Sequence, residues 1–360
     1  MTKTRPGRFF EDFALGERIA HAVPRTLGQG ERALYHALYP ARGALHSSDA
    51  FARGCGLPAP PLDDLLVFHT VFGRSVPDVS LNAVANLGYA EARFLRPVFP
   101  GETLRAESEV IGLKQTSSGR TGVVYVRTRG LSGDEPVLDY VRWVLVPKRD
   151  PDAPAPLEAV PDLAPFVAPE TLAVPEGLDF SAYDFALAGE PHRWGDYAVG
   201  EVIDHLDGAT VEEAEHMMAT RLWQNTARVH FDATAREDAR RLVYGGHVIS
   251  LARALSFNGL ANAQMVVAIN GGAHVAPCFA GTTVRAWSEV LDRAGTAAPG
   301  VGALRLRLVA VQGDAGGDGG GRGRAGPASR RGGALRARRA ARSRLLGAGP
   351  DLTRGARRER

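Results

Sequence analysis

An internal repeat restricts the fold of this chain more than any other feature of its sequence. Residues 97–110 and 277–290 share the pattern Pro-x-Phe-x-Gly-x-Thr-x-Arg-Ala-x-Ser-Glu-Val, at an offset of 180 residues without a gap. Residues 122–126 match residues 302–306 at the same offset, and the segment from Asp12 matches the segment from Asp196 at an offset of 184. We therefore predict a tandem duplication, in which two copies of one domain follow each other.

The first copy has the pattern of an α+β domain. Residues 58–72 begin with prolines and continue as an apolar helix, and a shorter helix is predicted over 31–38. Alternating apolar and polar residues predict strands over 86–93, 103–113, 122–129 and 137–146, after a first strand at 16–21. One apolar helix beside a long antiparallel sheet is typical of an α+β fold. In the second copy, helices are predicted over 210–222 and 247–255.

The repeat divides the chain into four predicted segments. The two copies cover 1–148 and 191–312, and 149–190 joins them as an extended linker, because seven prolines lie within 149–175. Residues 313–360 are rich in Gly, Arg and Ala and contain no counterpart of strand 137–146. We predict that the second copy lacks its last strand, that the tail is disordered or irregular, and that a frameshift in GC-rich coding DNA produced it. A functional Arg/Gly tail is the alternative.

Composition excludes several classes of protein. The 44% hydrophobic and 23% charged residues are those of a globular chain, and no apolar run is long enough to span a membrane. The formal charge is +3, but the tail carries +9, which leaves −6 on residues 1–312 and argues against nucleic-acid binding. Cys55 and Cys278 form neither a disulfide framework nor a metal cluster, and no secretory signal begins the chain. We expect a cytoplasmic protein.

The best candidate site lies between residues 222 and 256. His230 can move protons near neutral pH, and Gly245 and Gly246 open a helix whose free N–H groups can hold a developing oxyanion. Asn225 can orient a water molecule or the imidazole, but an amide cannot act as a general acid. A packed or surface histidine, and a Gly-Gly pair that forms only a turn, remain alternatives.

This stretch resembles the MaoC-like hotdog enoyl-CoA hydratases, in which a Thr-Gly-Asp-x-Asn-Pro-x-His loop precedes a helix that starts at a glycine. On that pattern His230 matches the family histidine, Asn225 the aspartate, Ala227 the asparagine and Arg228 the proline. A closer resemblance, to the double-hotdog mesaconyl-CoA (2-methylfumaryl-CoA) hydratases, covers about residues 5–310. Residues 6–12, 65–69, 76–89, 224–230 and 251–262 carry it. The resemblance implies a tandem hotdog, each half a sheet wrapped on a central helix.

The two copies differ at the expected site. In the first copy His46 has the family spacing, Ala41 replaces the aspartate, and Asp63 lies near the start of the helix. The first copy is then a structural half that covers the substrate, or a degenerate site. Asp63, His46 and His247 remain further candidate site residues.

The resemblance implies hydration of an α,β-unsaturated acyl-CoA, with mesaconyl-C1-CoA giving β-methylmalyl-CoA. His230 would be the base, the Gly246 N–H the oxyanion donor, and Arg228 a contact for the free carboxylate of the substrate. An acyl-CoA-binding hotdog protein without chemistry and an acyl-CoA thioesterase are the alternatives. We expect no cofactor, no metal site and no membrane partner. Homo-oligomer formation is left open.

Overall fold

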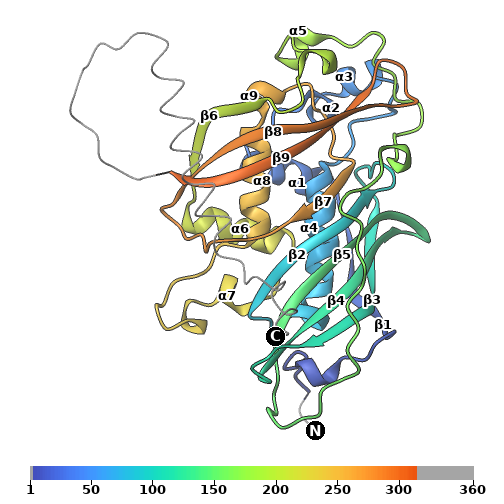
Figure 1. Cartoon of the computed structure of the whole chain (residues 1–360). Helices are drawn as coiled ribbons and strands as arrows, with labels where there is room; N and C mark the ends of the chain where they lie inside the picture. The colour runs from blue at the N-terminus through green and yellow to red at the C-terminus, as the bar shows by residue number, and fades with distance from the viewer. Residues whose placement is uncertain (1–2, 314–360) are drawn as a thin grey trace, which may run out of the picture. The chain divides into compact units, whose positions relative to one another are not determined.

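Two antiparallel sheets, each packed on an apolar helix, account for the part of the chain that the structure describes, residues 3–313 of a computed structural model (Figure 1). The first half contains β1 (Arg18–Thr26), α1 (Gln29–Leu38), α2 (Ala44–Ser47), α3 (Asp49–Gly54), α4 (Asp64–Ser75), β2 (Ala85–Phe94), β3 (Thr103–Gln115), β4 (Thr121–Ser132) and β5 (Glu135–Pro147). The second contains α5 (Phe185–Ala188), β6 (Val202–Thr210), α6 (Glu213–Leu222), α7 (Arg228–Phe231), α8 (Gly245–Leu255), α9 (Phe257–Leu260), β7 (Ala268–Gly272), β8 (Thr283–Gly295) and β9 (Gly302–Gly313). Residues 3–313 belong to one compact unit.

The central helix of the first half is buried along its whole length, as its apolar sequence predicts. Every residue of α4 from Asp64 to Ser75 is buried. Strand β4 alternates between buried and half-buried positions over most of its length, which is the pattern of a sheet with one face on the core. The predicted helix at 58–72 and the predicted strands of this half are confirmed, although α4 begins only after the proline-rich turn.

A strand of the second half extends the sheet of the first half. The larger sheet has the order β1-β3-β4-β5-β2-β7, so that β7 of the second half pairs antiparallel with β2 of the first. Two of the pairs, Tyr89 with Gly272 and Ala92 with Ile269, exchange places under the 180-residue offset of the sequence repeat. The repeat is therefore also a local two-fold symmetry of the fold at this junction.

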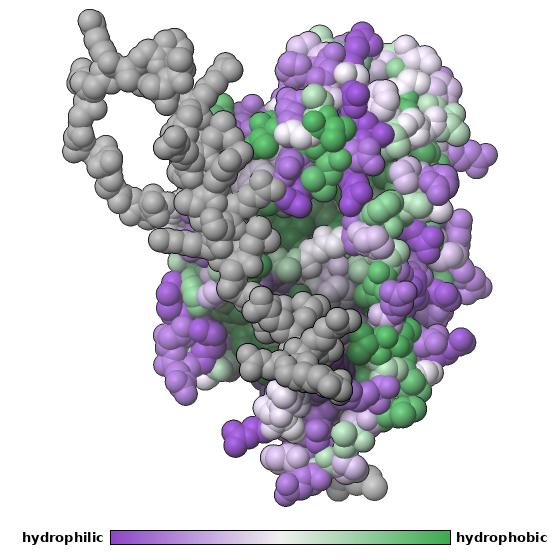
Figure 2. All heavy atoms as spheres, viewed as in Figure 1, coloured by the Kyte–Doolittle hydropathy of each residue, from purple (hydrophilic) through white to green (hydrophobic). Residues whose placement is uncertain are grey.

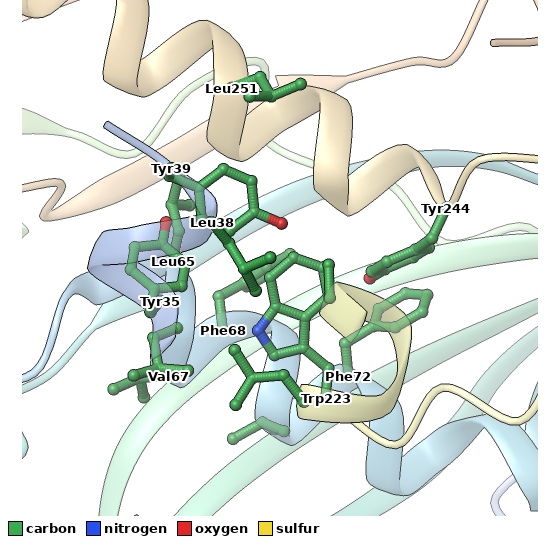
Figure 3. Close-up of a cluster of buried hydrophobic side chains, with 14 of the residues drawn as sticks. Tyr35, Leu38, Tyr39, Leu65, Val67, Phe68, Phe72, Trp223, Tyr244 and Leu251 are labelled. Carbon is green, nitrogen blue, oxygen red and sulfur yellow. The ribbon is translucent and has the colours of Figure 1, made fainter. Parts of the chain in front are cut away.

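Aromatic side chains from both halves pack together between α4 and α8 (Figure 3). Trp223 is fully buried and stacks on Tyr39 of the first half, with ring centroids 5.9 Å apart and planes at 9°. Tyr244 packs against Phe72 at 5.6 Å. Because these rings belong to a core that includes residues of both copies, the halves stabilise each other by burying apolar surface.

The second sheet is smaller than the first. Its order is β6-β8-β9, and within residues 3–313 no strand follows β9 as β5 follows β4. At the positions of β9 that correspond to Val124 and Val126, Leu304 and Leu306 are only half-buried. In Figure 2, which has the same view as Figure 1, apolar surface lies in a hollow on the face toward the viewer. The predicted tail, except for Gly313, lies outside the described residues, and its origin stays a prediction.

The segment between the two copies is partly anchored. Ala159 forms a β-bridge with Leu113, and Leu178 and Ala188 are buried in a cluster with Phe51 of α3. The predicted linker therefore packs on the first half over its later residues. Among residues 3–313, no helix has both the length and the apolar character needed to cross a bilayer.

Candidate active site

The loop between α6 and α7 positions the candidate base. Asn225 is 2% exposed, and its Oδ1 accepts a hydrogen bond from the backbone N–H of Ala227 at 3.1 Å. This turn leads directly into α7, the short helix that carries His230. A side-chain oxygen that caps the next turn is a common use of Asn. In this structure Asn225 shapes the loop that holds the histidine.

One nitrogen of His230 is held by the backbone. Nδ1 lies 2.8 Å from the carbonyl oxygen of Leu242, which can only accept, so Nδ1 carries the proton. The lone pair of the neutral ring is then on Nε2, for which we find no hydrogen-bond partner within residues 3–313. The pKa of His230 is lowered to about 4, mainly by burial. The hydrogen bond to Leu242 raises this pKa, and the nearby His216 and His274 lower it. Near neutral pH the imidazole is therefore uncharged and can accept a proton at Nε2.

The glycine pair begins α8, as predicted, but each glycine has a packing role that the sequence did not reveal. A Cβ on Gly246 would lie 2.3 Å from the ring of Tyr244 and 2.6 Å from that of His69, and a Cβ on Gly245 would lie 2.2 Å from the ring of His274. Neither position can carry a side chain unless a ring moves. The N–H of His247 donates to the carbonyl of Tyr244 at 2.9 Å, whereas those of Gly245 and Gly246 come too early in the helix to have a partner within it.

Aromatic and imidazole rings that sequence reasoning missed surround the start of α8. His69 of α4 lies with Nδ1 3.3 Å from the hydroxyl of Tyr244, and burial lowers the pKa of His69 to about 3. The rings of His230 and Tyr244 are 5.6 Å apart. His274, in the segment after β7, has Nε2 3.4 Å from the hydroxyl of Tyr89 in β2. Both halves therefore contribute side chains around one helix N-terminus.

The first half contains the corresponding loop, but its histidine is occupied on both sides. Nδ1 of His46 lies 3.3 Å from the carbonyl oxygen of Pro61, as Nδ1 of His230 does from that of Leu242. Nε2 of His46, however, lies 3.0 Å from the carbonyl oxygen of Gln264. The carbonyl oxygen of Gln264 therefore contacts Nε2 of His46, whereas Nε2 of His230 in the second half is open.

Asp64 completes this filled site. Its Oδ2 accepts a hydrogen bond from the N–H of Val266 at 2.7 Å and lies 3.9 Å from Nε2 of His46. Burial raises the pKa of Asp64 to about 6, against the attraction of His46, which lowers it. Backbone groups of Gln264 and Val266, from the second half, therefore contact the first-half loop at His46 and Asp64. In the second copy the corresponding nitrogen of His230 is open.

The other candidates lie away from His230 or point elsewhere. Asp63 caps α4 through a 2.9 Å hydrogen bond from the N–H of Leu65, and His247 is buried with Nδ1 2.8 Å from the hydroxyl of Tyr39. Arg228 is exposed and donates a long hydrogen bond of 3.4 Å to the carbonyl of Pro6. Within the described residues, no group of three or more His, Cys, Asp or Glu side chains could hold a metal ion.

Comparison with known proteins identifies the family of the chain. A family profile described as mesaconyl-CoA hydratase matches residues 1–324. The chain belongs to this family. It is 74% identical over 311 residues to a mesaconyl-CoA hydratase from Cereibacter sphaeroides, covering 86% of this chain and 91% of the relative. It is 57% identical over 317 residues to a beta-methylmalyl-CoA dehydratase from Chloroflexus aurantiacus, covering 86% and 90% of the two chains.

A solved structure confirms the predicted fold class. A conserved protein from Mycobacterium tuberculosis, described as having a double hotdog fold, superposes with a TM-score of 0.71 at 29% identity, covering 87% of this chain and 94% of that one. The chain is therefore a tandem hotdog of the α+β class, with a second sheet smaller than the first.

Proposed function

We propose that this chain catalyses the reversible addition of water to mesaconyl-C1-CoA to give β-methylmalyl-CoA. One structural observation carries the proposal: His230 has Nδ1 fixed on the Leu242 carbonyl and Nε2 open, and its ring lies 5.6 Å from that of Tyr244, the residue before α8. The family match and the two named relatives support this choice of substrate. Because the substrate is an acyl-CoA, we also propose a cytoplasmic location.

The chemistry requires a base and a group that stabilises negative charge on the thioester oxygen. In the proposed step, Nε2 of His230 takes one proton from water while the water oxygen bonds to the β-carbon of the substrate. The electron pair of the C=C bond moves toward the thioester oxygen, which the N–H groups of Gly245 and Gly246 hold. His230 then returns its proton to the α-carbon, so that atoms and charges balance.

A single histidine is sufficient for this cycle, which agrees with the absence of a carboxylate at position 225. Asn225 keeps His230 in place through the turn that it caps. The low pKa of His230 means that the base is free at neutral pH. Arg228, two residues before His230, is our candidate for binding the free carboxylate of the substrate through two parallel hydrogen bonds. A plain surface arginine is the alternative.

The test is a side-by-side assay of the purified 360-residue chain with mesaconyl-C1-CoA and crotonyl-CoA. Loss of absorbance at the enoyl-thioester band reports hydration, and a thiol reagent reports released CoA. We expect hydration of mesaconyl-CoA without thiol release. Thiol release would show a thioesterase instead, and saturable binding without either signal would show a binding protein.

A further inference from the structure

The position of His274 is unusual when the two copies are compared. At the offset of 180 residues it corresponds to Phe94, a core residue that is 6% exposed and packs against Phe68 of the central helix α4. Two pairs of the β2–β7 ladder, Tyr89 with Gly272 and Ala92 with Ile269, obey the same offset, and the ladder ends two residues before His274. At this aligned position the second copy therefore has an exposed imidazole instead of a buried apolar ring.

A second difference makes room for that imidazole. Asp64, the first residue of α4, and Leu65, at the 180-residue offset from Gly245, both have side chains, whereas α8 begins with Gly245. The ring edge that carries both nitrogens of His274 faces Gly245: Cε1, Nε2 and Nδ1 would lie 2.2, 2.5 and 2.6 Å from a Cβ at that position. The imidazole thus occupies the space of a side chain at the helix start, beside the first amides of α8, while His274 remains exposed to solvent.

The neighbouring hydroxyl of Tyr89 allows the tautomer of His274 in which Nδ1 carries the proton. Tyr89 is 3% exposed, and burial raises the pKa of its hydroxyl well above the usual value, so the hydroxyl stays protonated. It lies 3.4 Å from Nε2 of His274 and can donate to it. Although part of the residue is exposed, the protein atoms around the ring desolvate it and lower the pKa of His274, which favours the uncharged ring. An uncharged ring that accepts at Nε2 has its N–H at Nδ1 and can donate that hydrogen to a ligand.

We propose that His274 is a second hydrogen-bond donor for the thioester oxygen, acting through Nδ1–H together with the first amides of α8. This inference rests on the proposed hydration of an acyl-CoA. As the C=C bond takes up water, negative charge moves to the thioester oxygen, and the imidazole stabilises that charge without giving up its proton. His230 alone exchanges protons with water and the α-carbon, so His274 begins and ends each turnover unchanged.

Two substitutions separate this role from packing and from proton transfer. His274→Phe installs the residue that the first copy has at this position, so it fills the space but cannot donate. His274→Asn keeps an N–H close to the place of Nδ1 but cannot transfer a proton. His192→Phe alters another exposed histidine and is the matched control.

With mesaconyl-CoA, we expect His274→Phe to lower kcat by about 10²–10³, the loss typical of one oxyanion donor, with little change in KM. His274→Asn should recover at least about tenfold of that loss, and all three variants should keep the thermal midpoint of the wild type.

If the wild type is active and His274→Phe stays within about threefold of it, the role of His274 is refuted and the proposed function stands. If His274→Asn is as inactive as His274→Phe, the donor role is refuted in favour of proton transfer. A wild type that hydrates neither mesaconyl-CoA nor crotonyl-CoA would refute the proposed function, and the role of His274 with it.

Discussion

Replacement of Gly73 by Ala tests how the first half holds the loop that leads to His230. Gly73 lies near the end of α4, and a Cβ there would lie 1.9 Å from the backbone oxygen of Trp223 and 3.5 Å from the backbone N of Asn225. The next residue, Arg74, donates a hydrogen bond of 3.2 Å to that same oxygen. Helix α4 therefore packs directly on the backbone of the loop.

The cost of this substitution follows from the overlap. Real Cβ contacts are essentially never shorter than 3.0 Å, so the loop must move by about 1 Å to clear the methyl group. Overpacking costs about 1–3 kcal/mol, and we take the upper end because backbone cannot rotate away. The better helix propensity of Ala offsets about 1 kcal/mol, which leaves a net destabilisation of about 2 kcal/mol. A shift of about 1 Å in the loop that carries His230 should lower kcat on the order of 10²-fold.

The measurement combines urea unfolding with initial rates of mesaconyl-CoA hydration. Gly30→Ala is the matched control, because Gly30 is also helical but is exposed, and a Cβ there would have no heavy atom within 4 Å. It should stabilise the chain by up to about 1 kcal/mol and leave kcat unchanged. If Gly73→Ala proves as stable and as active as Gly30→Ala, the close approach of α4 to the loop is wrong.

Three further predictions concern the two histidine loops. His46→Ala removes the ring whose two nitrogens face the Pro61 and Gln264 carbonyls. It should lower the free energy of unfolding by about 1–3 kcal/mol, while kcat stays within about threefold. An unchanged thermal midpoint would contradict the role of His46 in holding these carbonyls. Arg228→Met should abolish turnover of mesaconyl-CoA but spare residual activity on crotonyl-CoA, whereas equal losses would mean a structural role. The pKa of His230 is about 4, and the base must be unprotonated, so kcat/KM should stay constant down to about pH 5 and fall below pH 4. A decline centred near pH 6.5 would contradict the burial of this ring.

The repeat and the plan of each copy could be predicted because they depend on local patterns. Alternation over 103–113 gave β3, and the apolar run before residue 72 gave α4. The pairing of β7 with β2 was not predicted, because a five-residue segment with two glycines has little strand character of its own. Its partner, in the other half, determines its conformation.

The candidate site was only partly predictable. The spacing in residues 225–246 indicated His230 and the glycine pair, but the reason for the glycines lies partly in the rings of His69 and His274, which are outside that stretch. The offset between the copies contained a usable signal, since it sets His274 against Phe94. The filled state of the first site was not predictable, because it depends on where the backbone of Gln264 lies.

The most direct test of the central claim compares His230→Ala with His46→Ala in mesaconyl-CoA hydration. The two histidines occupy corresponding loops, and both have Nδ1 on a backbone carbonyl, but only His230 has an open Nε2. We predict that His230→Ala lowers kcat by about 10²–10⁴ with its thermal midpoint retained, while His46→Ala keeps most of the activity. Equal losses at the two positions, or full activity without His230, would contradict the assignment of the chemistry to the second half.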